Sequence, residues 1–475
     1  MIAEDVFFAS IREQGALLRS RKLSAVELTE ACLDRLERLG PRLGAVVTVT
    51  GERALAQAHR ANQELLAGHD RGPLHGIPYG AKDLLATRGI PTTWGAEPLR
   101  QQVFDHDAAV VERLEQAGAV LVAKLAMVEL AGGLGYNNPD ASFTGPGRTP
   151  WNTDYWSGGS SSGSAAAVAA GLVSFAIGSE TSGSILTPSA FCGVTGLRPT
   201  YGLVSRHGAM ALCWTLDKLG PLARSADDAA LVLSAIAGLD PRDPATGESF
   251  RYRERPQTGR RFRLGVLQGA TLDCDPDVKA SFEHATAALR EVADLETDVA
   301  FPDLPYREAV SLIVDAEGGA ALRPLIESGQ VRSLQDPADR VGGYAMLATR
   351  AADYLDALRS RVAMRAQLDR LLSRFDAVIA PTRTRLAPPI GRDLDAPAAG
   401  TPSPLAETEG PHPPATIPAG NLAGLPAIAV PAGFGRDRLP TSLQLLGRAF
   451  TEARLVAIAD AYQRLTDWHR RRPPL

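Results

Sequence analysis

Lysine is scarce in this sequence. Of its 50 basic residues, 45 are arginines, and the five lysines are Lys22, Lys82, Lys124, Lys218 and Lys279. Arginine stays protonated at any working pH, whereas a buried lysine can lose its proton and act as a base. Because the chain relies on arginine for its positive charge, each lysine calls for its own explanation.

The sequence also lacks an excess of basic charge. Its 50 basic and 54 acidic residues give a net charge of -4, whereas surfaces that bind phosphate backbones are usually basic, so we expect no nucleic-acid partner. The four cysteines lie far apart, with no C-x-x-C pair and no histidine at metal-binding spacing. We therefore expect reduced structural cysteines, no metal site and no cofactor.

Long apolar runs are absent as well. No run approaches the roughly 18 residues that span a bilayer, and the segment MIAEDVFFAS carries acids where a signal peptide needs positive charge. We expect a cytoplasmic protein with no membrane partner. The 475 residues, 45% hydrophobic and 22% charged, can bury a large core, which excludes a disordered chain and a small disulfide scaffold.

Short apolar runs bounded by glycine and proline alternate with helical stretches along the chain. A capping box of Ser24 and Glu27 starts the first long helix. The alternation is typical of an α/β protein. The expected helices cover 25–39, 108–118 and 226–238, and the expected strands cover 76–81, 119–123, 173–178, 261–267, 375–382, 425–433 and 439–447.

If the late strands join the early ones, the chain 1–475 forms one large domain. The part at 381–418 holds ten prolines in 38 positions, too many for a helix or a central strand, so we expect a loop, with a lid as the sharper interpretation. The five expected parts are an N-terminal helical region at 1–70, a core with the candidate catalytic residues at 71–238, helical and strand additions at 239–380, the proline-rich loop at 381–418, and C-terminal strands and a helix at 419–475.

Two serine-rich segments, 155–171 and 177–193, stand out. By composition SGGSSSGS could be a flexible linker, but an alanine-rich helical stretch follows at Ser164, which favours a loop that leads into a helix N-terminus. The same segment matches G-x-S-x-G, with Ser161 as the nucleophile of an α/β-hydrolase. That motif needs a buried strand directly before it, and the preceding NTDYWS is polar. None of the histidines available for its triad is marked out by the sequence: His207, His284, His412 and His469.

The chain resembles the amidase signature family in the order and spacing of GIPYGAKDL, GGSSSGS, GSETSGSI and CGVTGLRPTYGLVS. The similarity extends from the N-terminal helix to LPTSLQLLGRAFTEARL near the C-terminus. The resemblance implies a single α/β domain with a central mixed, mostly parallel β-sheet covered by helices on both faces.

In that family a lysine, a serine after a cis peptide bond and a nucleophilic serine form the catalytic triad. The matching positions are Lys82, Ser160 and Ser184. A serine hydroxyl is a weak nucleophile, so Ser184 would give its proton to Ser160, which would pass its own to Lys82. Lys82 must be neutral for this, and since a free lysine has a pKa of about 10.4, burial must lower that pKa. The mostly apolar neighbours of Lys82 fit this requirement, with Asp83 expected to point elsewhere.

The resemblance also assigns binding roles to two short segments. The loop Thr181, Ser182 and Gly183 would direct backbone N–H groups at the developing oxyanion. Within 127–133, Ala131 and Gly132 would contact the substrate, whereas apolar neighbours such as Met127 are expected in the core.

The sequence departs from the family pattern around the nucleophile. An acid one methylene longer than the usual aspartate stands at Glu180, and with the usual arginines missing we expect it to pair with Arg198 or Arg206. The departing residues are Ser162, Glu180, Ser182, Leu186 and Leu203.

The resemblance implies an amidase that hydrolyses the C–N bond of a small linear carboxylic amide, with aryl amides, esters and carbamates (a urethanase activity) as extensions. The alternative is the glutaminase subunit of a tRNA-dependent amidotransferase, which acts only inside a complex. Members with that role have an acid shortly before the Thr-Ile-Pro step, where this chain has Pro411, His412, Pro413 and Pro414. An inactive binding protein is disfavoured because all three triad positions are filled. The oligomeric state stays open, a homodimer included.

Overall fold

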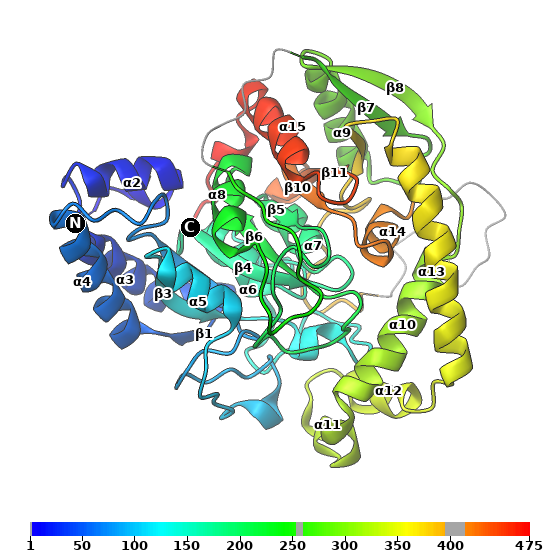
Figure 1. Ribbon diagram of the computed structural model, residues 1–475, viewed down its shortest axis with the longest axis horizontal. Helices are drawn as coiled ribbons and strands as arrows, with labels where there is room; N and C mark the ends of the chain where they lie inside the picture. The colour runs from blue at the N-terminus through cyan, green and yellow to red at the C-terminus, as the bar shows by residue number, and fades with distance from the viewer. Residues whose placement is uncertain (1, 253–259, 395–413) are drawn as a thin grey trace.

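Apolar runs from both halves of the chain form the strands of one mixed sheet in the computed structural model, which describes residues 2–252, 260–394 and 414–475 (Figure 1). The sheet has eleven strands in the order β1-β3-β2-β4-β6-β5-β10-β11-β9-β7-β8, so early and late strands join and the expectation of one α/β domain is confirmed. The strands are β1 (Val46–Val49), β2 (Pro78–Lys82), β3 (Val120–Leu125), β4 (Phe175–Glu180), β5 (Thr195–Arg198), β6 (Lys218–Ala223), β7 (Phe262–Leu267), β8 (Ala293–Val299), β9 (Ala377–Pro381), β10 (Ala427–Phe434) and β11 (Pro440–Leu446).

The prediction of a mostly parallel sheet is wrong. Among the described strands, four neighbouring pairs are parallel and six are antiparallel. The antiparallel pairs include β10 and β11, which only residues 435–439 separate. So short a connection allows a hairpin, whereas a parallel pair needs a long crossover.

Both faces of the sheet are buried, as predicted. On β4, Phe175 and Ile177 belong to one hydrophobic cluster, and Ala176 between them belongs to another. Because successive strand residues point to opposite faces, the two clusters lie on the two sides of the sheet. Helix α8 (Ala226–Ile236) contributes to the first cluster and α6 (Ser162–Ala169) to the second.

The remaining helices surround this core. The capping box at Ser24 and Glu27 forms as predicted. Figure 1 shows α2 to α4 at one end of the molecule and α10 to α13 at the opposite end. In the described chain, the α-helices other than α6 and α8 are α1 (Glu4–Phe7), α2 (Ile11–Arg19), α3 (Ala25–Leu43), α4 (Gly51–Leu66), α5 (Ala109–Gln116), α7 (Leu186–Cys192), α9 (Pro276–Leu289), α10 (Tyr306–Ala321), α11 (Arg323–Glu327), α12 (Asp339–Met346), α13 (Ala351–Leu372), α14 (Thr416–Leu422) and α15 (Glu452–Leu465).

All seven predicted strands form, and four further strands were missed: β1, β5, β6 and β8. The region 1–70 is therefore not purely helical, since it contains β1. Strand β8 has the sequence ADLETDV and is largely exposed at the sheet edge, so it lacks the apolar signal of a buried strand.

The structure describes residues 381–394 and 414–418 of the proline-rich segment. Its expected end at 418 is wrong, because α14 begins at Thr416. The lid interpretation rests mainly on 395–413, which lie outside the described residues. Among the helices within the described ranges, none is both long and apolar enough to cross a membrane.

Candidate active site

The predicted site residues gather at one edge of the sheet. Strand β2 runs parallel to both of its neighbours, β3 and β4, so the three strands end at the same edge. Lys82 is the last residue of β2, the loop that holds Ser184 follows β4, and Ser160 lies in the loop before α6. The fold therefore brings together residues separated by about a hundred positions in the sequence.

Lys82 and Ser160 are in direct contact beneath the surface. The Lys82 Nζ atom lies 2.7 Å from Ser160 Oγ and 2.9 Å from Ser179 Oγ. Lys82 is completely buried and Ser160 is 1% exposed. The peptide bond between Gly159 and Ser160 is cis, as the resemblance implies.

Burial changes the protonation of Lys82. It lowers the pKa of the Lys82 amine to about 7, although the negative charges of Asp217 and Glu180 act in the opposite direction. A buried ammonium loses most of its hydration, which favours the neutral form. Near neutral pH a large share of Lys82 can therefore accept a proton.

Ser184 is linked to the segment of Ser160 through its backbone and is partly open to solvent. Its side chain is partly exposed, and its carbonyl oxygen accepts a hydrogen bond of 3.2 Å from the Ser161 N–H group. Within the described part of the chain, the Ser184 hydroxyl makes no hydrogen bond. It is thus free to approach a substrate carbonyl.

The loop before Ser184 offers unused backbone donors. The Glu180 carboxylate accepts hydrogen bonds from the N–H groups of Ile185 (2.8 Å) and Leu186 (3.0 Å), which fixes the chain directly after Ser184. The N–H groups of residues 182–184 donate to none of the described residues. Gly183 has a φ of 91°, a left-handed conformation that favours glycine. Ser182 stands where the family pattern has glycine, and its side chain is exposed to solvent.

Glu180 pairs with Arg198, one of the two predicted partners. Arg198 Nη1 lies 2.9 Å from Glu180 Oε1, with both side chains fully buried, and Asn421 donates a second hydrogen bond of 2.8 Å to the same oxygen. Burial alone would raise the pKa of Glu180, but the attraction of Arg198 outweighs it, so the pKa lies below its usual value. Arg206, the other candidate, pairs with Asp243 at 2.8 Å.

Breaking this buried pair should be costly. We expect Arg198→Met to lower the free energy of unfolding by about 3–5 kcal/mol, since it leaves Glu180 buried without its cation. Chemical denaturation measures the loss. Arg448→Met is the matched control, because Arg448 pairs with Asp369 at 2.9 Å while about half exposed, and it should cost less than about 1 kcal/mol. Equal losses in the two variants would contradict the role of the buried pair.

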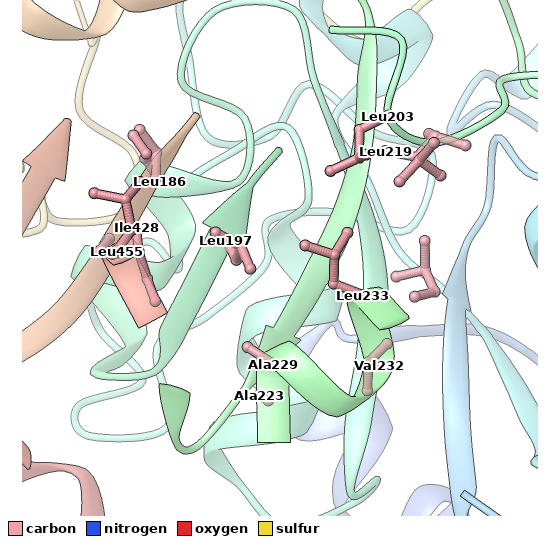
Figure 2. Close-up of a cluster of buried hydrophobic side chains, with 14 of the residues drawn as sticks. Leu186, Leu197, Leu203, Leu219, Ala223, Ala229, Val232, Leu233, Ile428 and Leu455 are labelled. Atoms are coloured by element: carbon pink, nitrogen blue, oxygen red, sulfur yellow. The ribbon is translucent and has the colours of Figure 1, made fainter. Parts of the chain in front are cut away.

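The two leucines at positions where the family often has arginine belong to the main hydrophobic core. Leu186 and Leu203 are at most 1% exposed. Figure 2 shows them among the buried side chains that include Leu197, Leu219 and Ile428. Both leucines are therefore core residues in this chain, and the cation that pairs with Glu180 is Arg198 at the end of β5.

The other lysines divide into two groups. Lys124 is buried and forms an ion pair of 3.0 Å with Asp83, so Asp83 points away from Lys82 as expected. Lys218 is also buried, whereas Lys22 and Lys279 are exposed. Three of the five lysines are therefore interior residues.

A cavity of about 430 Å³ opens beside the site. Its lining includes Ser179, which contacts Lys82, Thr181 of the loop before Ser184, and Ala131, for which substrate contact stays a prediction. Gly132 is not part of this lining. Its φ is 82°, and a side chain there would collide with Tyr136, so glycine is required by the fold at this point. Met127 is completely buried in the core, as expected.

The sequence did not reveal several residues of the site. Ser179 lies within the GSETSGSI motif, and only its contact with Lys82 sets it apart. Asp217 accepts a hydrogen bond from Thr181 and lines the cavity, but it precedes β6, a strand that the sequence did not predict. The aromatic residues Tyr201 and Trp214 also line the cavity: Tyr201 lies within the CGVTGLRPTYGLVS motif, which gave no sign of this role, and Trp214 belongs to none of the motifs.

The two other interpretations of the serine-rich segment are wrong. Residues 157–164 are all buried, which excludes a flexible linker. Ser161 is not at the end of a strand, since the described chain has no strand between β3 and β4. Its hydroxyl oxygen bonds the backbone of Ser179, with distances of 3.2 and 3.3 Å to the carbonyl oxygen and the amide nitrogen. Ser161 therefore supports the site and does not have the geometry of a hydrolase nucleophile.

Comparison with known proteins identifies the family and the fold of the chain. One relative, a subunit of the glutamyl-tRNA(Gln) amidotransferase of Moorella thermoacetica, is 36% identical, covering 99% of each chain. The corresponding protein from Roseiflexus sp. is 39% identical over 97% of this chain and 96% of its own. The solved peptide amidase of Stenotrophomonas maltophilia superposes with a TM-score of 0.85 at 33% identity, covering 98% of both chains. The family model described as Amidase matches residues 27–456, and the chain belongs to this family.

Proposed function

We propose that this protein hydrolyses carboxylic amides through a covalent acyl-enzyme on Ser184, with Ser160 and Lys82 as the proton relay. The observation that carries the proposal is the 2.7 Å contact between Ser160 Oγ and the buried Lys82 amine, whose pKa lies near 7. A relay through a hydroxyl needs such a base, and a general base works best when its pKa is close to the working pH.

In this mechanism the Ser184 oxygen attacks the carbonyl carbon while its proton moves to Ser160, whose own proton moves to Lys82. The negative charge that develops on the carbonyl oxygen is stabilised by the N–H groups of residues 182–184, which donate to none of the described residues. The C–N bond then breaks, and the amine leaves with a proton returned through the relay. Water then attacks the acyl carbon and gives its proton to the same relay. The bond between this carbon and the Ser184 oxygen breaks, the carboxylic acid leaves, and Ser184 regains its proton.

The lining of the cavity favours a substrate that has a neutral, apolar group beside the scissile bond. Its arginines are already paired within the protein: Arg206 with Asp243, and Arg242 with Asp240 and Glu112. Much of the remaining lining is apolar, including Leu84, Met210, Leu212 and Leu219. A buried charge on the substrate would find few free counter-charges there. Aryl or alkyl amides fit this lining, and esters and carbamates follow because the same acyl transfer serves them.

A second candidate is the glutaminase subunit of a tRNA-dependent amidotransferase. It is supported by the names of the two amidotransferase relatives, which match nearly the whole chain at 36% and 39% identity and favour this candidate more directly than a free-standing amidase. The same three residues would release ammonia from glutamine. The positions 411–413, where the sequence lacks the expected acid, lie outside the described residues.

A substrate panel separates the two candidates. The purified chain should hydrolyse a neutral anilide and a neutral carbamate, and should release little ammonia from free glutamine, because glutamine carries an ammonium and a carboxylate that the cavity does not match. Released amine and ammonia are measured, with Ser184→Ala as the blank. Glutaminase activity that appears only on addition of the other amidotransferase subunits, with no anilide turnover, would establish the second candidate instead.

A further inference from the structure

Two carboxylates hold the loop of residues 181–184 at its two ends. Glu180 binds the N–H groups just after Ser184, as described above. Asp217 binds the opposite end, where Thr181 Oγ1 donates a hydrogen bond of 2.6 Å to Asp217 Oδ1. Between these two anchors lie the N–H groups that donate to none of the described residues.

Asp217 also binds the wall of the cavity. Its second oxygen, Oδ2, accepts hydrogen bonds from the N–H groups of Leu212 (2.9 Å) and Cys213 (2.8 Å). Asp217 is itself part of the cavity lining, together with Leu212 and Thr181. One side chain therefore connects the catalytic loop to the wall against which a substrate would lie.

That wall is in turn fixed to the helices. The Glu317 carboxylate on α10 accepts hydrogen bonds from the Thr215 N–H group (2.9 Å) and hydroxyl (2.7 Å), and from Cys213 Sγ (3.2 Å). The Tyr354 hydroxyl on α13 donates to the same carboxylate at 2.9 Å. The segment that holds Asp217 therefore has independent support, so Thr181 is tied to a rigid part of the molecule.

From these contacts we infer that Asp217 is a positioning residue, which through the Thr181 hydroxyl holds the loop 181–184 in the conformation that stabilises the oxyanion. The inference rests on the proposed acyl transfer at Ser184. An oxyanion is stabilised only by donors that are already aligned, because donors that must reorganise lose much of their effect. Loss of the Thr181 hydroxyl should therefore weaken the transition state and leave substrate binding in the cavity largely unchanged.

The test compares Thr181→Val with Thr181→Ser. Valine keeps the shape of threonine but cannot donate to Asp217, whereas serine keeps the hydroxyl. For a neutral anilide substrate, Thr181→Val should lower kcat by about 10- to 100-fold with KM within about threefold of wild type, and Thr181→Ser should stay within about threefold in both. Should Thr181→Val be poorly folded by thermal melting, Thr181→Ala provides the same comparison, since it also removes the hydroxyl that donates to Asp217.

A second readout separates positioning from a general structural role. Phenylboronic acid forms a tetrahedral adduct with an active-site serine and mimics the transition state, so its affinity should fall in Thr181→Val in proportion to kcat. Wild-type kcat in Thr181→Val, a change confined to KM, or equal losses in the valine and serine variants would overturn the inference. The Ser184→Ala variant shows whether the inference or the proposed function has failed. If Ser184→Ala is inactive and Thr181→Val is fully active, only the role of Asp217 is refuted. If Ser184→Ala is active, the acyl transfer itself is refuted.

Discussion

Ser184→Ala should lower kcat for an amide substrate by about 10⁴-fold or more. The variant keeps the cavity and the loop donors but loses the oxygen that forms the acyl-enzyme, and removal of a nucleophile from a cooperating set abolishes most of the catalysis. Any remaining rate would come from water attacking in the same site. The fold should be unaffected, since the Ser184 hydroxyl makes no hydrogen bond within the described part of the chain.

The measurement is steady-state hydrolysis of an anilide, with thermal melting as the check on folding. Ser161→Ala is the matched control, because Ser161 is the neighbour of Ser160 in the buried segment 157–164 and, within the described residues, its hydroxyl bonds only the Ser179 backbone. We expect this control to keep activity within about tenfold of wild type, the effect of losing a supporting hydrogen bond. A Ser184→Ala enzyme with more than a tenth of the wild-type rate would show that the nucleophile has been assigned to the wrong residue.

Lys82→Ala and Lys82→Arg should both lower kcat/KM by about 10²- to 10⁴-fold, the usual contribution of a general base. Arginine keeps the positive charge and cannot give up its proton, so its failure would distinguish a base from a merely charged group. A fully active Lys82→Arg variant would exclude Lys82 as the proton acceptor.

The pH dependence of the wild-type enzyme follows from the same lysine. Burial lowers the pKa of Lys82 to about 7, so its amine is mostly protonated below that pH and mostly neutral above it. The value of kcat/KM should therefore rise with pH up to about 7, nearly tenfold per unit at the acidic end, and then level off. The residual rate of Lys82→Ala should fall further at low pH, where any substitute base is protonated. A wild-type rate that is constant from pH 5 to 9 would contradict the neutral-lysine mechanism.

Much of the fold could be predicted from local sequence patterns. Strands β2, β3 and β4 carry apolar runs bounded by glycine or proline, and their parallel arrangement places Lys82 and the Ser184 loop at one edge. The strands that were missed lack this signal. Strand β6 has the sequence KLGPLA, in which glycine and proline disfavour a strand prediction although its antiparallel neighbours β4 and β5 hold it in the sheet.

The contacts around the site were less predictable than the motifs themselves. The partner of Glu180 could be narrowed to two arginines, and the choice of Arg198 depends on β5 lying close to the end of β4 across β6, which no local pattern records. The Asp217 contact with Thr181 joins residues 36 positions apart through that same unpredicted strand. Such contacts depend on how distant segments pack together, whereas the spacing within a motif describes only residues that are close in the sequence.

Most of the few lysines in this chain are buried. Lys82, Lys124 and Lys218 are buried, and burial lowers the pKa of each of them, to about 7 for Lys82 and Lys218. Lys124 forms an ion pair with Asp83 at 3.0 Å, whereas the Lys82 amine, among the described residues, hydrogen-bonds only to the hydroxyls of Ser160 and Ser179. Of the two, Lys82 is therefore the lysine placed to exchange protons with a serine.

Covalent labelling tests the assignment of the nucleophile most directly. The intact protein is incubated with a serine-directed acylating inhibitor, digested, and examined by mass spectrometry to locate the adduct. A single acyl group on Ser184, absent from Ser184→Ala and much slower to form in Lys82→Arg, is the expected result. An adduct on Ser161, or on any residue other than Ser184, with labelling of Ser184→Ala at the wild-type rate, would contradict it.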